Sequence, residues 1–324
     1  MNVVVKRVGA FALAAAASGY VHCVLAQPYP TRPIRIVAAS TPGSGPDVVA
    51  RLIAQKLAER LGQQVMVVNR AGVGGNLGAE AVARATPDGY TLLLAMASHA
   101  IGMTLYKKPA YDLERDFAAV APVASTPFIL VTHPSLPATS VKELIALARA
   151  RPGELLFGSG GAGTPPHLCT EIFKVAARIS FVHVPYKGIT PALVDLYGGQ
   201  LHSAFSSMPA AMPFIRSARL RALGVTAPKR SPMAPGIPSV AETLPGFDVV
   251  GWYGLVVPAG TPPDVVERLH SATGSILGAA DAIEQLRRLG ADPIHGTSAA
   301  FSSFIVAEVR KWGKAVKDSG AEAD

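Results

Sequence analysis

The sequence contains few residues of the kind that form disulfides or bind metals. Only two cysteines, Cys23 and Cys169, occur among its 324 residues, and no C-x-x-C motif is present. If Cys23 is removed with an N-terminal leader, Cys169 has no partner within the chain, which excludes an internal disulfide. The eight histidines are scattered, and neither an i, i+4 pair nor an H-E-x-x-H motif occurs. We therefore predict no metal site.

Charged and aromatic side chains are also scarce. Charged residues make up 16% of the chain and aromatic residues 6%, whereas hydrophobic residues make up 49%. This composition excludes a disordered chain and is sufficient for the buried cores of about two α/β domains. The basic residues are dispersed and are not interleaved with aromatic residues, so nucleic-acid binding is not predicted. The net charge of +8 is consistent with a mild attraction for anions.

Long apolar runs are absent from the body of the chain, which excludes membrane-spanning helices of roughly 20 residues there. The N-terminus differs, because Lys6 and Arg7 precede the apolar run Val8–Gly19, and the small or aliphatic residues Val24-Leu25-Ala26 stand before Gln27. This pattern is typical of a secretory signal peptide covering residues 1–26. Its removal would leave 30 − 2 = 28 basic and 22 acidic side chains in an exported, soluble mature chain.

Short β-rich runs alternate with amphipathic helical patterns along the body of the chain. The alternation predicts an α/β fold with parallel, doubly wound sheets. The predicted helices include 48–61, 141–150, 263–277, 280–289 and 299–316. The predicted buried strands are 34–38, 65–68, 91–94, 128–132, 155–157 and 181–184.

A polar loop with two glycines follows the first predicted strand. It reads Ser40-Thr41-Pro42-Gly43-Ser44-Gly45-Pro46-Asp47 and leads into a helix, for which Asp47 is the predicted N-cap. Glycines allow successive N–H groups to converge, and a helix N-terminus adds partial positive charge. The loop therefore favours a bound carboxylate or phosphate, and a capped turn without a ligand is the alternative.

A second glycine-rich loop, Gly158-Ser159-Gly160-Gly161-Ala162-Gly163-Thr164, precedes a helical stretch that contains His167. Its G-x-G-x-x-G pattern at 158–163 raises the alternative of a nucleotide-binding enzyme. A dinucleotide site requires an acidic residue after the next strand, whereas the chain there reads Tyr186-Lys187-Gly188. We therefore favour a second anion-binding loop in which the Ser159 and Thr164 hydroxyls are available.

A third strand leads directly into Ser98 and His99. His99 is a candidate donor to an anion, although a lone histidine is more often a structural hydrogen-bond partner. A hydrolase that uses these two residues would need a third group and a nucleophile elbow, and no G-x-S-x-G or GxxxxGK[ST] motif occurs. We therefore predict neither an enzyme nor a cofactor.

Seven motifs in this order resemble those of the Bug-type extracytoplasmic solute receptors, the substrate-binding proteins of tripartite tricarboxylate transporters. They are P-I-R-I-V at 33–37, D-V-V-A-R at 47–51, V-N-R at 68–70 with the glycines of 72–78, P-D-G-Y-T-L at 87–92, G-T-P-P-H-L at 163–168, V-P-Y-K-G at 184–188 and P-A-G-T-P at 258–262. The resemblance covers nearly the whole mature chain.

The resemblance implies a periplasmic-binding-protein type II fold, a Venus flytrap of two doubly wound α/β lobes joined by crossing strands. Lobe 1 is expected to comprise residues 30–125 plus 250–324, and lobe 2 residues 126–249. A small organic acid is then held between the lobes in the periplasm and delivered to the permease subunits of a membrane transporter. A receptor that feeds a sensor kinase is the alternative.

Carried over onto this sequence, the resemblance implies a ligand site formed by the two loops and their surroundings. The family segment M-F-D-N-L-P is replaced here by A-F-S-S-M-P at 204–209, which places Ser206 where an acidic residue often stands and disfavours ligands with an amine. The predicted ligand-binding residues are Ser40, Thr41, Gly43, Ser44, Gly45, Asp47, Ser98, His99, Ser159, Gly161, Ala162, Gly163, Thr164, His167, Tyr186 and Ser206.

Overall fold

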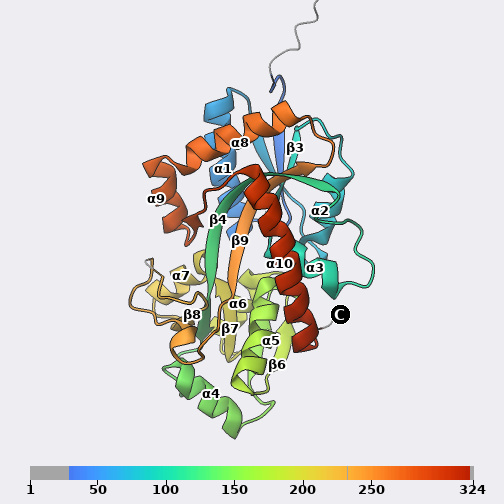
Figure 1. Ribbon diagram of the computed structural model, residues 1–324. Coiled ribbons are helices and arrows are strands. Elements are labelled where there is room, and N and C mark those ends of the chain that lie inside the picture. The colour runs from blue at the N-terminus through green and yellow to red at the C-terminus, as the bar shows by residue number, and fades with distance from the viewer. Residues whose placement is uncertain (1–28, 232, 322–324) are drawn as a thin grey trace, which may run out of the picture.

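The computed structural model describes residues 29–231 and 233–321, so the predicted signal peptide lies outside the described residues. Ten strands of the described chain are connected in the order β2-β1-β3-β9-β4-β7-β5-β6, and β8 and β10 pair with β4. Figure 1 shows two lobes, one above the other, that are connected by the long strands β4 and β9. The predicted α/β fold of two lobes joined by crossing strands is confirmed.

Lobe 1 is built on three parallel strands. They are β1 (Ile34–Ala38), β2 (Val65–Asn69) and β3 (Thr91–Met96). Ile34, Ile36 and the leucines of β3 are fully buried, because helices cover the sheet. The helices of this lobe are α1 (Gly45–Leu61), α2 (Asn76–Ala83), α3 (Ala97–Leu105), α8 (Pro263–Leu277) and α9 (Ala280–Arg288).

Lobe 2 repeats this plan around a second set of parallel strands. They are β5 (Leu156–Ser159), β6 (Val182–Pro185) and β7 (Ser203–Ser207), and β8 (Arg221–Val225) pairs with β4. Stacked aromatic rings fill part of the core, with Phe157 and Phe181 separated by 3.8 Å between centroids. The helices are α4 (Val141–Ala150), α5 (Pro165–Ala177), α6 (Ile189–Tyr197) and α7 (Met208–Arg216).

Two antiparallel strands, β4 (Phe117–Thr132) and β9 (Val250–Pro258), connect the lobes. The sequence predicted only 128–132 of β4. A proline such as Pro122 is unfavourable inside a regular strand. The structure accommodates Pro122 at an irregularity, where the register between the two strands shifts. The first part of β4 also pairs with β10 (Asp292–Pro293).

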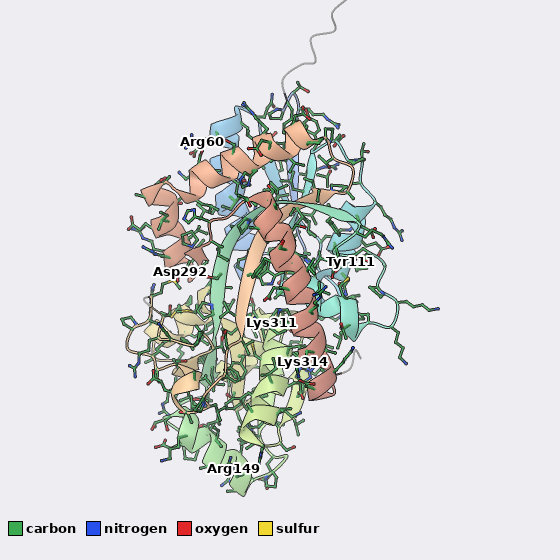
Figure 2. The ribbon with its side chains drawn as sticks, viewed as in Figure 1. Arg60, Tyr111, Arg149, Asp292, Lys311 and Lys314 are labelled. Carbon is green, nitrogen blue, oxygen red and sulfur yellow. The ribbon has the colours of Figure 1, made fainter. Side chains whose placement is uncertain are left out.

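The last helix, α10 (Ser298–Ser319), crosses from lobe 1 toward lobe 2 (Figure 1). It packs against α3 in lobe 1 and against α5 in lobe 2. Lys311 and Lys314 mark its lower half in Figure 2. No helix in the described ranges 29–231 and 233–321 combines the length and the hydrophobicity needed to cross a bilayer.

Candidate functional site

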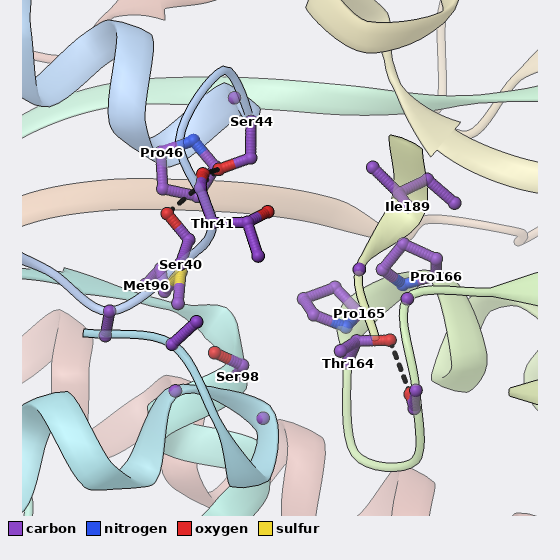
Figure 3. A pocket seen from close by; sticks show the side chains of 18 of the residues that line it. Ser40, Thr41, Ser44, Pro46, Met96, Ser98, Thr164, Pro165, Pro166 and Ile189 are labelled. Atoms are coloured by element: carbon purple, nitrogen blue, oxygen red, sulfur yellow. Dashed lines mark hydrogen bonds between the residues drawn. The ribbon is translucent and has the colours of Figure 1, made fainter. Parts of the chain in front are cut away.

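A cavity of about 770 Å³ lies between the lobes, where the carboxyl ends of their parallel strands meet (Figure 3). Strands β3, β6 and β7 end at residues that line it, and β1, β2 and β5 end within two residues of its wall. The volume falls within the range of small-molecule sites, roughly 300–1,000 Å³. The lining residues are Ala39, Ser40, Thr41, Ser44, Gly45, Pro46, Ala71, Gly72, Val73, Gly74, Gly75, Met96, Ser98, Tyr106, Phe128, Gly160, Gly161, Ala162, Thr164, Pro165, Pro166, Pro185, Tyr186, Lys187, Gly188, Ile189, Ser207 and Tyr253.

Six helices, α1, α2, α3, α5, α6 and α7, begin at this cavity, because the N-cap residue of each is among the lining residues. A helix N-terminus carries a partial positive charge, and unpaired N–H groups of its first turn can bind an anion. Lys187 is the only charged residue among the described residues that line the cavity. The electrostatic field of the cavity therefore favours an anion.

The first predicted loop is held in shape by Asp47. Its carboxylate accepts hydrogen bonds from the Gly43 N–H and from Asn69 Nδ2, each at 2.8 Å, and pairs with Arg51 at 3.0 Å. Burial alone would raise the pKa of Asp47, but the hydrogen bonds from Arg51, Gly43 and Asn69 and the charge of Arg51 lower the pKa overall. Asp47 is therefore a buried anion that supports the loop.

The predicted role of Asp47 as N-cap is wrong, since α1 begins at Gly45 and Ser44 is its N-cap. The Gly43 N–H is used by Asp47, and the Ser44 N–H donates to the Thr41 carbonyl at 3.3 Å. Pro46 has no N–H to offer. The Gly45 and Asp47 N–H groups belong to the first turn, which no carbonyl of the helix can satisfy. The loop therefore presents fewer free donors than its sequence suggested.

The second loop also uses much of its hydrogen-bonding capacity internally. The Gly161 N–H donates to Ser159 Oγ at 3.1 Å, and the Gly163 N–H donates to His167 Nδ1 at 3.2 Å. The Thr164 hydroxyl donates to the Gly161 carbonyl at 2.7 Å (Figure 3). Thr164 therefore lines the cavity without a free hydroxyl proton.

Two histidines support this loop from behind. His167 and His183 stack with 4.2 Å between ring centroids, and His183 Nε2 lies 2.6 Å from Ser159 Oγ. Neither histidine is among the cavity-lining residues. Within the described part of the chain, no group of three His, Cys, Asp or Glu side chains is arranged to hold a metal ion.

Ser98 and His99 have different roles although they are adjacent. Ser98 is 2% exposed and lines the cavity, and its Oγ has no hydrogen-bond partner within the described residues. His99 is fully buried, its Nδ1 accepts from the Met96 N–H at 3.2 Å, and burial lowers its pKa to about 4. The two side chains therefore form no nucleophile–base pair, as a hydrolase would require.

Nine of the sixteen predicted site residues line the cavity, and the other seven lie outside its wall. Those that line it are Ser40, Thr41, Ser44, Gly45, Ser98, Gly161, Ala162, Thr164 and Tyr186. Those outside the wall are Gly43, Asp47, His99, Ser159, Gly163, His167 and Ser206. Most of these seven hold the loops through hydrogen bonds that were not evident from the sequence.

Ser206 is the clearest example among these seven. It is fully buried in β7, and its hydroxyl donates to the Ser207 carbonyl at 3.1 Å. Successive side chains of a strand point to opposite faces, and it is Ser207 that lines the cavity. The substitution that removes the family's acidic residue at Ser206 therefore lies behind the wall.

Nineteen of the 28 residues that line the cavity were not predicted from the sequence, and Ser207 and Tyr253 are two of them. Ser207 ends β7 immediately before a helix, the same strand-to-helix transition that identified the other loops. Tyr253 lies in the middle of β9, where the local sequence gives no signal. Both approach the first loop, since a methyl group on Gly45 would lie 3.0 Å from Tyr253 Oη and 3.2 Å from Ser207 Oγ.

The two lobes touch at the mouth of the cavity. A methyl group on Gly188 of lobe 2 would lie 3.3 Å from Thr41 Oγ1 of lobe 1. A methyl group on Gly163 of lobe 2 would lie 3.1 Å from the Tyr106 hydroxyl oxygen of lobe 1. Glycines therefore occupy the positions at which the lobes approach most closely.

The two-lobed fold and the cavity between the lobes define a solute-binding receptor of the periplasmic type. The chain belongs to the tripartite tricarboxylate transporter family of receptors, whose sequence pattern matches residues 49–321. The predicted receptor family is thus confirmed, and members of this family are substrate-binding receptors rather than enzymes.

Known proteins resemble the chain over most of its length. It is 37% identical to protein BugT of Bordetella pertussis over 310 residues, which cover 95% of each chain. A solved R. palustris structure with adipate is 36% identical with a TM-score of 0.88, covering 91% of this chain and 100% of that chain. MatC from Rhodopseudomonas palustris with bound malate is 29% identical with a TM-score of 0.83, covering 89% and 100%.

Proposed function

We propose that this receptor captures a small carboxylate between its lobes in the periplasm and delivers it to the permease subunits of a tripartite tricarboxylate transporter. The observation that carries the proposal is the convergence of six helix N-termini on one cavity that no acidic residue of the described chain lines. A carboxylate placed there replaces its lost hydration with N–H donors and helix dipoles. The bound acids of the two similar solved structures, adipate and malate, support this class of ligand.

Export and lobe division belong to the same proposal. Residues 1–26 act as the signal peptide, and the mature chain begins near Gln27. Residues 30–125 plus 250–324 form lobe 1 and residues 126–249 form lobe 2, with one extension, because α10 also packs against α5. The ligand acts as a link between the lobes, and the closed form is the one that the permease recognises.

The experiment is a thermal-shift screen of the purified mature chain against organic acids, followed by calorimetry. A ligand that binds only the native state raises the melting temperature by mass action. Amides of the same acids are the matched controls, because they keep the size of the ligand and remove its charge. We expect saturable binding of at least one acid, recovered unchanged, and no binding of its amide. Binding of amides only, or recovery of an altered ligand, would refute the proposal.

A further inference from the structure

The two faces of the cavity differ in chemistry, as the opposing groups of side chains in Figure 3 show. The lobe 1 face carries hydroxyls, on Ser40, Thr41, Ser44 and Ser98. The lobe 2 face carries rings and a branched chain, on Phe128, Pro165, Pro166, Pro185 and Ile189. Met96 and Pro46 also lie on the lobe 1 face and Thr164 on the lobe 2 face, so the difference is one of proportion. A ligand that touches both faces meets more hydroxyls on the lobe 1 side and more apolar surface on the lobe 2 side.

On the lobe 1 face, Ser98 is the best-placed polar group. It is buried and its Oγ has no partner among the described residues, so without a ligand it carries the cost of an unmade hydrogen bond. It is also the second residue of α3, where N–H groups of the first turn are unsatisfied by the helix. Hydroxyl and helix N-terminus together suit one carboxylate.

On the lobe 2 face, the hydroxyls of Thr164 and Tyr186 are engaged elsewhere, whereas Ser207 lies beside Gly45 of lobe 1. The Thr164 hydroxyl donates to the Gly161 carbonyl, and the Tyr186 hydroxyl donates to Asp195 at 2.7 Å. α5 begins with Pro165 and Pro166, which have no N–H groups. Lys187 lines the cavity but its side chain is exposed to solvent, where an ion pair contributes little. A second carboxylate placed against this face would lose its hydration with little in return.

We propose that the ligand is an acid with a single charged end and an apolar body, bound with its carboxylate against Ser98 of lobe 1 and its body against Ile189, Pro165 and Pro166 of lobe 2. This inference rests on the proposed function and specifies the class of acid. In this arrangement, Ser98 contacts the charged end of the ligand and Ile189 contacts its apolar end.

The experiment compares acids of equal length that differ by one carboxylate. The pairs are butanoate with succinate, hexanoate with adipate, and phenylacetate with 1,4-phenylenediacetate, measured by calorimetry on the mature chain. In every pair that binds, we expect the monocarboxylate to bind about tenfold tighter or more. A dicarboxylate that binds equally or more tightly overturns the inference and leaves the proposed function standing. Absence of binding by every acid, in these pairs and in the wider screen, refutes the proposed function itself.

Three variants test which residues contact the charged end and the apolar end of the ligand. Ser98→Ala should weaken every binding monocarboxylate by about tenfold, because it removes a hydrogen bond to the charged group. Ile189→Thr should weaken hexanoate severalfold more than butanoate, since it places a hydroxyl on the apolar wall. Lys187→Gln should change both members of a pair by the same small factor. A selective loss of dicarboxylate binding in Lys187→Gln would show that Lys187 reads a second carboxylate and would contradict the inference.

Discussion

At the residue scale, Gly45 shows how space alone can require a glycine. Its backbone does not lie in the left-handed region, yet a methyl group there would approach the hydroxyls of Tyr253 and Ser207 to 3.0 and 3.2 Å. Gly45, the first residue of α1, therefore lies close to Tyr253 of the crossing strand β9 and to Ser207 of lobe 2. The absence of a side chain keeps the Gly45 N–H accessible to a ligand.

We predict that Gly45→Ala lowers the affinity for the bound acid by about tenfold or more and changes the free energy of unfolding by only about 1 kcal/mol or less. The added methyl group crowds Tyr253 and Ser207 beside the Gly45 N–H. For stability, this crowding offsets the preference of a helix for alanine over glycine, which is about 1 kcal/mol. Gly274→Ala is the matched control, because Gly274 is an exposed residue of α8 with nothing near its missing side chain. Calorimetry and urea unfolding measure the two effects, and an unchanged affinity in Gly45→Ala would move the ligand away from this loop.

His99 should make the stability of the fold depend on pH. Burial lowers its pKa to about 4, below the ordinary value of 6.5. Between these values the unfolded chain binds a proton that the folded chain does not, so the contribution of His99 is complete above pH 6.5 and is lost as pH falls toward 4. The lowered pKa of Asp47 acts in the same direction but only near and below its ordinary value of 3.8.

We predict that His99→Asn flattens the loss of unfolding free energy between pH 6.5 and 4. Asparagine can accept the Met96 N–H in place of Nδ1 but does not titrate, which removes a slope of at most about 1.4 kcal/mol per pH unit. Urea unfolding of both proteins at pH 7, 5.5 and 4.5 measures this. Parallel stability curves for the two proteins would show that His99 is protonated equally in the folded and unfolded chains.

At the element scale, α10 is fastened to the crossing strand β9 by one buried carboxylate. Glu308 Oε2 accepts the indole N–H of Trp252 in β9 at 2.9 Å and that of Trp312 in α10 at 2.8 Å. Glu308 Oε1 accepts from Lys311 at 3.2 Å. Because α10 also packs against α3 and α5, this cluster connects the hinge to both lobes.

We predict that Glu308→Ala destabilises the fold by about 2–4 kcal/mol, because it leaves two buried indole N–H groups without an acceptor. Glu308→Gln retains one acceptor oxygen at the same place and should cost less than about half as much. Glu284→Ala is the surface control, since Glu284 forms an exposed ion pair with Arg288 in α9. Trp252 and Trp312 are the two tryptophans of the chain, so urea unfolding followed by fluorescence reports on this cluster directly. Equal stability of all three variants would refute the role of Glu308.

The helices and strands with strong local patterns were predictable from the sequence, whereas those that depend on the partner element were not. Strand β1 and helices α4 and α8 have the predicted bounds, because each has a clear apolar face and a proline or N-cap at its start. The first half of β4 was missed, since its alanines and Pro122 carry little strand signal and only pairing with β9 makes it a strand.

At the scale of the whole molecule, the site also has features that local sequence predicts and features that depend on contacts between distant segments. The loops were predictable, because strand-to-helix transitions of both lobes must meet at one edge of each sheet. Which groups of these loops line the cavity was not predictable. Gly43 and Gly163 donate their N–H groups to Asp47 and His167, and only the folded loops bring these partners together. Tyr253 reaches the cavity from a strand that lies far from both loops in the sequence.

Ligand binding should change the separation of the lobes, because the lobes are joined by the crossing strands and bridged by α10, and the cavity lies between them. An acid that contacts both faces binds the closed arrangement better and shifts the population toward it. The exposed residues Arg70 of lobe 1 and Thr190 of lobe 2 each adjoin a cavity-lining residue, so they sit at opposite rims. Their separation is a direct measure of closure.

We predict that spin labels on Arg70→Cys and Thr190→Cys move to a shorter and narrower distance distribution when a binding acid is added. The single cysteine of the mature chain, Cys169, is fully buried and its thiol pKa is raised by burial, so it should not react with the label. Labels on Arg70→Cys and Lys108→Cys, both in lobe 1, should keep one distance with and without the acid. Closure requires the first pair to respond and the second to remain constant. A change in both pairs would indicate local rearrangement, and a change in neither would mean that the acid binds without moving the lobes.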